Sequence, residues 1–291
     1  MPKVIQVVIP ESVMNSASDI ARNYDQYFAS HLYDKRYPGP NPSSLAIVMR
    51  EIAQGRKKLL DLGCGNGRYT APLLAQTDTK IIACDISHEA IDELSARCVA
   101  HIESGRLQPV CGDLSSLADS LDESEHFDLA IMMFGVLGHI SSRTLRQGTL
   151  ATIRKLLRPG GRLIVTVPNA ARRFRRRQIM AQPLVRAGRL EPGDIFYERT
   201  TGEVVIHMYY HLYTLDELVL DLEQSGFRPL YLGPESVLPE SGVVRSIPLR
   251  WIDRVLAAML PLRCAYGFLA VAEAKPMATD NDHSQQDRSR G

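Results

Sequence analysis

Five short apolar runs recur between residues 57 and 169, and most of the segments between them carry apolar residues at helical spacing. The runs cover residues 57–63, 80–86, 106–113, 127–135 and 161–169. Because each run is continuously apolar instead of alternating, it predicts a strand that is buried on both faces, as in a parallel sheet. Strands that alternate with helices predict a series of βαβ units, and therefore an α/β fold.

The flanking segments extend this pattern into one domain. We expect helices at 16–54, 214–227 and 250–262, and two further strands at 227–233 and 266–274. The prediction is a seven-stranded, mostly parallel sheet with helices on both faces. Residues 1–54 form an N-terminal segment with a helical lid, and residues 55–275 form the domain, with insertions at about 170–212 and 234–265. Residues 276–291 are polar and predict a disordered tail.

Composition limits the class of protein. The chain of 291 residues is 45% hydrophobic and 23% charged, with a formal net charge of +1. These values are typical of a soluble globular protein and argue against a dedicated nucleic-acid binder, which carries a large basic excess. The five cysteines form no C-x-x-C pair, which favours a reducing cytoplasm and no metal site. No apolar run is long enough to span a membrane.

The most informative stretch follows the first predicted strand. That strand ends at Asp61, and Gly63, Gly65 and Gly67 come directly after it. Glycines at a strand end let the backbone turn sharply and let a ligand approach closely. A dinucleotide fingerprint would need its third glycine at position 68, where the chain has Arg68. An acid at the strand end suits an ammonium group and would repel a pyrophosphate.

This stretch resembles the first motif of class I S-adenosylmethionine-dependent methyltransferases, D-x-G-x-G-x-G. Further segments over residues 57–168 resemble that family's later motifs in the same order: Asp85-Ile86, Gly112-Asp113-Leu114, 134–139 and 156–168. The resemblance implies a Rossmann-like fold and S-adenosylmethionine as cofactor. The cofactor-binding residues that it implies are Asp61, Gly63, Cys64, Gly65, Asn66, Asp85, Ile86, Asp113, Leu114 and Phe134, with Tyr24, Tyr33 and Arg36 from the lid.

Each of these residues also has a purely structural interpretation. Asp85 and Asp113 could be helix N-caps, and Cys64 a small apolar filler. Five motifs in register, one strand-helix unit apart, favour the cofactor interpretation.

Methyl transfer is an in-line displacement that depends mainly on positioning, so a general base is optional. His139, just past the fourth strand, is a candidate base, a neighbour of adenine or a capping residue. The stretch 204–217 adds His207 and His211 as catalytic candidates and Tyr209 and Tyr210 as substrate-binding candidates. The alternative is a half-buried strand, in which His207, Tyr209 and His211 share one face and Tyr210 lies on the other.

Arginines follow the fifth strand. Residues 171–200 contain eight arginines and three acids, so the rest of the chain has a net charge of about −4. A broad basic surface, as for RNA, is not expected, whereas an anionic metabolite needs one or two arginines. Arg172 and Arg173 are candidates for binding it, and both insertions are candidate pocket walls.

We therefore expect methylation of an oxygen or nitrogen of a small, anionic metabolite. A tRNA methyltransferase of the wobble-uridine type is the alternative, followed by a non-catalytic S-adenosylmethionine-binding protein or an NAD-type enzyme. The sequence is also compatible with a homodimer.

Overall fold

The computed structural model describes residues 17–122, 125–201 and 204–276. The tail predicted from residue 276 onward lies, but for Pro276, outside these ranges.

Seven strands form the central sheet in the order β3-β2-β1-β4-β5-β9-β8. Their bounds are β1 Lys58–Leu62, β2 Lys80–Asp85, β3 Leu107–Cys111, β4 Phe127–Met132, β5 Leu157–Pro168, β8 Phe227–Ser236 and β9 Gly267–Ala274. β1 to β5 pair in parallel, and β9 is antiparallel to both β5 and β8. The predicted seven-stranded, mostly parallel sheet is confirmed. Its strand order reverses between β1 and β4, and ligands of open α/β sheets bind at such a point, beyond the carboxyl ends of the strands.

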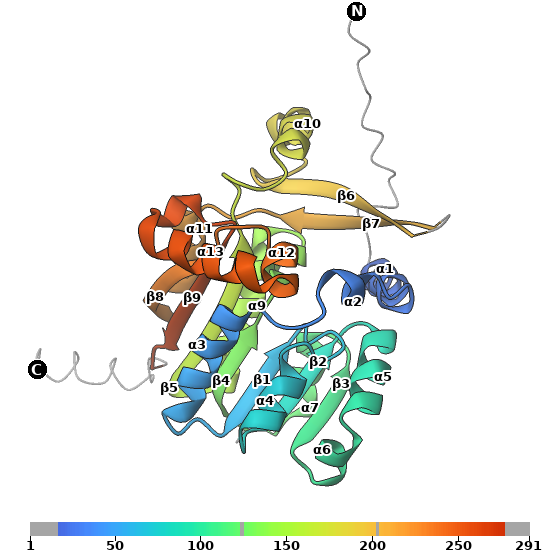
Figure 1. The fold of residues 1–291 in the computed structure, drawn as a ribbon, viewed down its shortest axis with the longest axis vertical. Coiled ribbons are helices and arrows are strands. Elements are labelled where there is room, and N and C mark those ends of the chain that lie inside the picture. Colours follow the sequence, from blue (N-terminus) through green and yellow to red (C-terminus); the bar gives the residue numbers. More distant parts are fainter. Residues whose placement is uncertain (1–16, 123–124, 202–203, 277–291) are drawn as a thin grey trace, which may run out of the picture.

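Helices cover both faces of the sheet, as predicted (Figure 1). One buried core joins it to α3 (Pro42–Ala53), α4 (Thr70–Gln76) and α5 (His88–Arg97). The other joins it to α7 (Leu114–Ser120), α9 (Arg143–Leu156) and α11 (Leu215–Gln224). The short helices α6 (Val99–Glu103) and α8 (Val136–His139) follow α5 and β4. Apolar residues on one side of α3, α5, α9 and α11 face the apolar strands, which fixes the three layers.

A third core lies above the carboxyl ends of the strands. The segment predicted as an insertion at 170–212 forms α10 (Arg175–Arg186) and a two-stranded antiparallel sheet of β6 (Asp194–Thr201) and β7 (Val204–His211). The N-terminal helices α1 (Ala17–Ala29) and α2 (Leu32–Arg36) lie between this sheet and the main one (Figure 1). Their aromatic residues pack against inward side chains of β6 and β7. The lid is therefore held under a β-ribbon.

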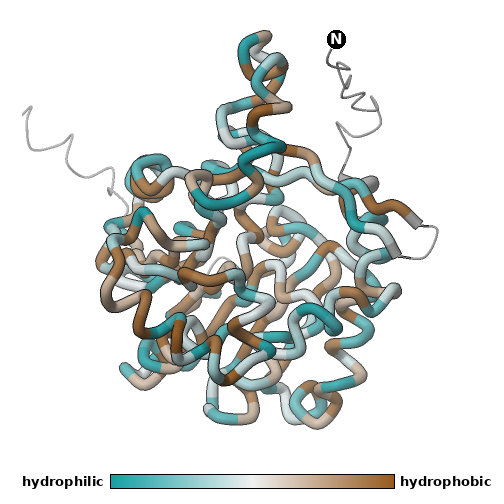
Figure 2. The backbone as a smooth tube through the Cα atoms, turned by 45° about the horizontal axis from the view of Figure 1, so that its top comes forward, coloured by the Kyte–Doolittle hydropathy of each residue, from teal (hydrophilic) through white to brown (hydrophobic). Residues whose placement is uncertain are grey.

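The second insertion contributes α12 (Glu240–Arg245), α13 (Ile247–Met259) and a 3₁₀ turn at Leu262–Cys264 beside β8. Helix α13 differs from the expectation that it would wall the substrate pocket. Among the residues that the structure describes, none from α13 lines either cavity described below. Its apolar side chains face solvent instead, while α10 projects from the body of the molecule (Figure 1 and Figure 2).

Within the described ranges, no helix is both long and apolar enough to cross a membrane.

Candidate active site

The glycine-rich loop after β1 requires glycine for two reasons. Gly63 and Gly65 have φ values of 65° and 53°, in the left-handed region that other residues rarely adopt. A Cβ on Gly63 would lie 2.5 Å from Val136 Cγ2, and one on Gly65 would lie 3.0 Å from Phe28 Cζ. The loop therefore packs closely under α8 and the lid helix α1.

Asp85, at the end of β2, fixes this loop. Its Oδ2 accepts a hydrogen bond from the Gly65 N–H at 2.8 Å, and its Oδ1 accepts one from the Ser87 N–H at 3.0 Å. Burial raises the pKa of the carboxyl group. The cap of α5 is Ser87, whose hydroxyl accepts from the Ala90 N–H. Asp85 is thus not the helix cap, and each of its oxygens keeps a lone pair for a ligand.

A cavity of about 470 Å³ lies above the loop, in the size range of small-molecule sites. The predicted cofactor residues that line it are Tyr24, Tyr33, Gly63, Gly65, Asp85, Ile86, Asp113, Leu114 and Phe134. Asp113 is also the N-cap of α7, since its Oδ1 accepts from both the backbone N–H and the hydroxyl of Ser116 at 2.8 Å. The capping interpretation therefore holds for Asp113 while its carboxylate still faces the cavity.

The other four predicted cofactor residues lie outside the cavity wall. Arg36 does not line it, and Cys64 is buried within the loop. Asp61 lies beneath the loop and accepts a hydrogen bond from the Thr70 hydroxyl at 2.6 Å, and burial raises its pKa to about 7. Asn66 donates to Asp34 of α2 at 2.9 Å and to Glu93 of α5 at 2.8 Å, so it ties the loop to the lid.

Arg68, the residue that breaks the dinucleotide pattern, supports the cavity wall from behind. Its guanidinium lies 4.6 Å from the centre of the Phe134 ring and donates to Glu240 Oε1 of α12 at 2.8 Å. Both partners of this ion pair are buried. Phe134 in turn contacts the ring of Tyr37.

His139 lies at the centre of the site. Its ring stacks on Tyr210 at 4.2 Å, and Tyr24 meets it edge-on. Burial lowers the pKa of His139 to about 4, so the ring is neutral at pH 7. Its Nδ1 lies 3.0 Å from the carbonyl oxygen of Tyr209, which can only accept a hydrogen bond. Nδ1 therefore carries the proton and Nε2 presents a lone pair.

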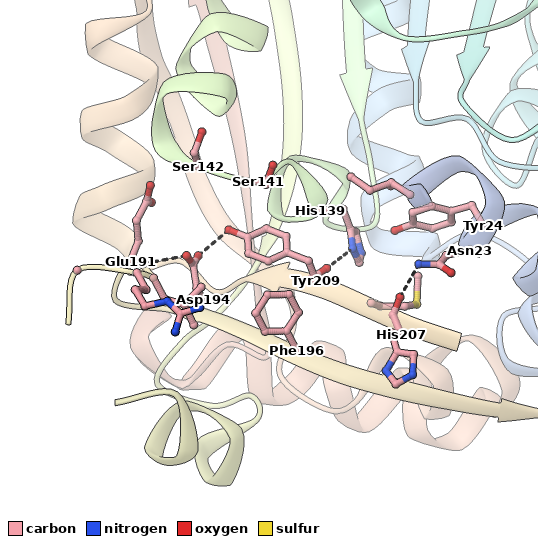
Figure 3. A pocket seen from close by; sticks show the side chains of 15 residues that line it. Asn23, Tyr24, His139, Ser141, Ser142, Glu191, Asp194, Phe196, His207 and Tyr209 are labelled. Carbon is pink, nitrogen blue, oxygen red and sulfur yellow. Dashed lines mark hydrogen bonds between the residues drawn. The ribbon is translucent and has the colours of Figure 1, made fainter. Parts of the chain in front are cut away.

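A second cavity of about 360 Å³ lies beside the first (Figure 3). The two share five lining residues: Ile20, Tyr24, His139, Ser141 and Met208. The new wall includes Glu191, Asp194, Phe196 and Tyr209 from the ribbon and the segment before it. Figure 3 shows Tyr209 and His139 joined across this wall.

The register of the ribbon confirms the predicted faces of β7. Tyr210 points to the main cavity and contacts His139, whereas Tyr209 faces the second cavity with His207. The side chain of His207 is 40% exposed and lies 3.5 Å from Glu198. His207 and Tyr209 therefore line the second cavity only.

His211 belongs to a buried charge network that anchors the ribbon. Its Nδ1 lies 2.6 Å from Asp194 and its Nε2 lies 2.9 Å from Glu217 of α11. Burial lowers the pKa of His211, but these two carboxylates outweigh it and hold the pKa above its usual value. Arg146 of α9 adds a bond to Glu191 at 2.5 Å. His211 lines neither cavity, so the structure gives it an anchoring role.

The two predicted substrate arginines have different surroundings. Arg172 is exposed, whereas Arg173 lines the main cavity, with its guanidinium 4.7 Å from the Tyr266 ring and 5.3 Å from the Tyr210 ring. Sequence reasoning missed Tyr197 and Arg199, which line the same cavity from β6. The alternation in residues 195–199, with Ile195, Tyr197 and Arg199 on one face, was the available signal.

Comparisons with known proteins agree with this geometry. A family profile described as a methyltransferase domain matches residues 59–161. Over 187 residues the chain is 30% identical to a demethylmenaquinone methyltransferase of Tropheryma whipplei (strain Twist), with 63% of this chain and 71% of that protein covered. The chain belongs to the class I S-adenosylmethionine-dependent methyltransferases. Its methyl donor is therefore S-adenosylmethionine.

Other relatives are matched over shorter stretches. The O-methyltransferase cnsE of Penicillium expansum is 30% identical over 48% of this chain and 50% of its own length. A tRNA (carboxymethyluridine(34)-5-O)-methyltransferase of Arabidopsis thaliana is 33% identical over 42% of this chain and 26% of its own. The chain thus spans half or less of these two relatives.

A solved structure shares the fold. The 1,6-didemethyltoxoflavin-N1-methyltransferase of Burkholderia thailandensis, with bound 1,6-didemethyltoxoflavin and S-adenosylhomocysteine, has a TM-score of 0.56. It is 20% identical, and the match covers 90% of this chain and 92% of that one.

The cavity suits the donor of this family. A carboxylate at the end of β2 and Cβ-free backbone at Gly63 and Gly65 leave room for a nucleoside. The aromatic rings of Tyr33, Tyr37 and Phe134 contact one another and line the same cavity, which suits a sulfonium cation.

The packing at Gly63 predicts a specific loss of stability. Gly63→Ala would combine left-handed strain of about 1–2 kcal/mol with overpacking of about 1–3 kcal/mol against Val136. Gly105→Ala is the matched control, because Gly105 has a φ of 67° and open space at its Cβ position. We expect urea unfolding to show a clearly larger loss for Gly63→Ala. Equal losses would contradict the close contact.

The low pKa of His139 predicts a pH dependence of stability. Because the folded-state pKa of about 4 lies below the unfolded value of about 6.5, the unfolded chain binds the proton first as pH falls. The wild type should therefore lose stability between pH 6.5 and 4, by up to about 1.4 kcal/mol per pH unit. His139→Asn, which keeps a donor for the Tyr209 carbonyl, should lack this loss. Urea unfolding of both proteins across that range measures it, and a constant difference between them would contradict the pKa.

Proposed function

We propose that the chain transfers a methyl group from S-adenosylmethionine to an oxygen or nitrogen of a small, anionic metabolite. The observation that carries this proposal is the pair Arg173 and Arg199 in the wall of the main cavity beside His139. Within residues 17–122, 125–201 and 204–276, neither guanidinium forms an ion pair with a carboxylate; each lies against aromatic rings.

One buried acid, Glu235, acts on Arg173 electrostatically. Burial, and after it the charge of Glu240, raises the pKa of Glu235 above its usual value. This shift favours the neutral form of the carboxyl group and weakens it as a counter-ion for Arg173. An unneutralised guanidinium in a cavity wall is a receptor for a carboxylate or phosphate, which it can bind in bidentate geometry.

The cofactor would be held by the groups nearest the glycine loop. Asp85 would accept from ribose hydroxyls, Ile86 would contact the adenine face, and Asp113 would accept from the adenine amine. Bound S-adenosylmethionine supplies a methyl group already activated by the sulfonium charge. The lid aromatics Tyr24 and Tyr33 line this region and would exclude water from the bound cofactor.

Positioning is the main contribution of the protein to the reaction. Holding two reactants in line can supply roughly 7–11 kcal/mol. His139 Nε2 would accept a hydrogen bond from the O–H or N–H of the acceptor and orient its lone pair. A pKa of about 4 makes His139 a weak base, so its role is orientation more than full proton removal.

A tRNA methyltransferase is the second candidate, and one surface favours it. Arg172, Arg175, Arg176 and Arg177 are exposed at the start of the projecting helix α10. Recognition of unpaired RNA also needs exposed aromatic side chains for stacking. Phe174 is the one aromatic residue of this segment, and its ring packs on Tyr197. This packing supports the small-molecule proposal.

A methyl-transfer assay separates the two candidates. The full chain is incubated with methyl-labelled cofactor and either total tRNA or a metabolite extract. We expect label in a small anionic product retained on an anion-exchange column. Label in the tRNA fraction alone would refute the proposed acceptor class.

Neighbouring arginines provide a matched test of the anion site. Arg173→Ala should reduce label transfer to the extract about tenfold or more, since a charge-assisted hydrogen bond contributes roughly 1.5–3 kcal/mol. Arg172→Ala, at an exposed position, should retain it. Cofactor affinity should be unchanged in both. Equal effects of the two substitutions on transfer would rule out Arg173 as the anion contact.

Asp85 tests the cofactor assignment separately. Asp85→Ala removes the acceptor of two ribose hydroxyls and should weaken cofactor binding by at least about 100-fold, at roughly 1.5–3 kcal/mol per charge-assisted bond. Asp85→Asn, which keeps one acceptor oxygen, should give an intermediate loss. Isothermal titration calorimetry measures both, with a thermal melt as the folding control. Retained affinity in folded Asp85→Ala protein would refute the assignment.

A further inference from the structure

Helix α13 is amphipathic, but its apolar side faces solvent and its buried side carries the carboxylate of Asp253. Seven of the fourteen large apolar side chains that are exposed among the described residues lie between positions 247 and 260. They are Ile247, Leu249, Trp251, Ile252, Val255, Met259 and Leu260. At 100° per residue, five of these seven fall on one side of the helix: Ile247, Trp251, Ile252, Val255 and Met259. Scattered exposed apolar residues are ordinary, but a contiguous stripe on one helix marks an interaction surface.

The inner face of α13 is fixed by a polar contact. Asp253 is 3% exposed, and its Oδ1 accepts from the backbone N–H groups of Val237 at 2.8 Å and Leu238 at 2.7 Å. Rotating the helix to bury Trp251 would remove the carboxylate from both donors and leave them unpaired. The apolar face is therefore directed outward by the fold itself.

The charge around this face has one sign. Residues 240–264 contain four arginines, Arg245, Arg250, Arg254 and Arg263, and two acids, Glu240 and Asp253. Both acids are buried, Glu240 in its ion pair with Arg68 and Asp253 against the backbone. Arg254 lies over the indole of Trp251 at 5.5 Å. Among the residues that the structure describes, none of these four arginines pairs with a carboxylate, so the surface that α13 presents is apolar with a rim of positive charge.

We propose that α13 docks on a membrane surface that contains anionic lipids. An amphipathic helix with tryptophan and aliphatic residues on one face and arginines at its flanks lies in the plane of the interface, with its apolar face among the acyl chains. The arginines then meet the negative headgroups, and the indole sits at the depth where tryptophan is enriched. Thirteen residues give a helix about 20 Å long, which lies on the surface and does not cross it.

Charge also decides between a membrane and a second copy of the chain. A two-fold contact through this face would bring two rims of arginine together with no exposed carboxylate from residues 240–264 to offset them. Like charges at an interface disfavour association. Anionic headgroups complement the same rim, so a lipid surface fits better than self-association.

The single tryptophan of the chain makes the test specific, because all indole fluorescence comes from Trp251. The full chain is mixed with vesicles of phosphatidylcholine alone, or of phosphatidylcholine with about one third phosphatidylglycerol. We expect a blue shift of the emission and co-flotation with the anionic vesicles. Both should weaken as salt rises, because screening shortens the range of the arginine–headgroup attraction.

Variants assign the binding to this face. Val255→Glu should lower vesicle partitioning by about tenfold or more, since burying one such side chain is worth roughly 1.5–3 kcal/mol. Arg254→Glu should lower binding to anionic vesicles and make the remaining binding less dependent on salt, because less arginine–headgroup attraction is left to screen. Ile179→Glu is the matched control, because Ile179 is an apolar residue on α10 that is more exposed than Val255. This variant should bind vesicles as the wild type does. Cofactor affinity should be the same in all four proteins.

Three outcomes would overturn the proposal. The first is the absence of co-flotation with anionic vesicles at low salt. The second is a concentration-dependent dimer in sedimentation that Val255→Glu abolishes, without vesicle binding, since this would assign the face to a second copy. The third is an emission maximum already blue-shifted in the free monomer, which would mean that another part of the chain covers the helix.

Discussion

The hydrogen bond from the Gly65 N–H to the Asp85 carboxylate holds the site together. It joins the loop after β1 to the end of β2, where the strand order of the sheet leaves an open crevice. The same carboxylate accepts from Ser87 at the start of α5, so one side chain sets the loop and the next helix. Because Gly63 and Gly65 have positive φ and no room for a Cβ, the loop depends on this bond and on close packing.

The upper half of the site depends on a different contact. The β6–β7 ribbon forms the roof over the lid helices, and it is fixed to the main domain by Arg146 of α9 and Glu217 of α11 through His211 and its carboxylate partners. This anchoring positions Tyr210. Because the ring of His139 stacks on Tyr210, the anchoring also orients His139. The charged residues of the ribbon thus affect the site by positioning Tyr210 and His139.

Much of this arrangement follows from the sequence. Continuous apolar runs predict the parallel strands, and the glycines after Asp61 predict the sharp turn that follows β1, because both patterns are local. The environments of Arg172 and Arg173 could not be predicted, since adjacent arginines differ only in the direction that the turn after β5 gives them. The orientation of α13 was also beyond reach: its apolar periodicity is the same whether that stripe faces a pocket or solvent, and Asp253 decides between them.

The wall shared by the two cavities links their occupants thermodynamically. Tyr24, His139 and Met208 each border both spaces, so a molecule in one cavity touches side chains that shape the other. Any adjustment of these three residues that favours one ligand changes the affinity for its neighbour by a fixed factor, and that factor is the same in both directions. Two molecules, one in each cavity, therefore cannot bind this protein as independent ligands whenever the shared wall moves.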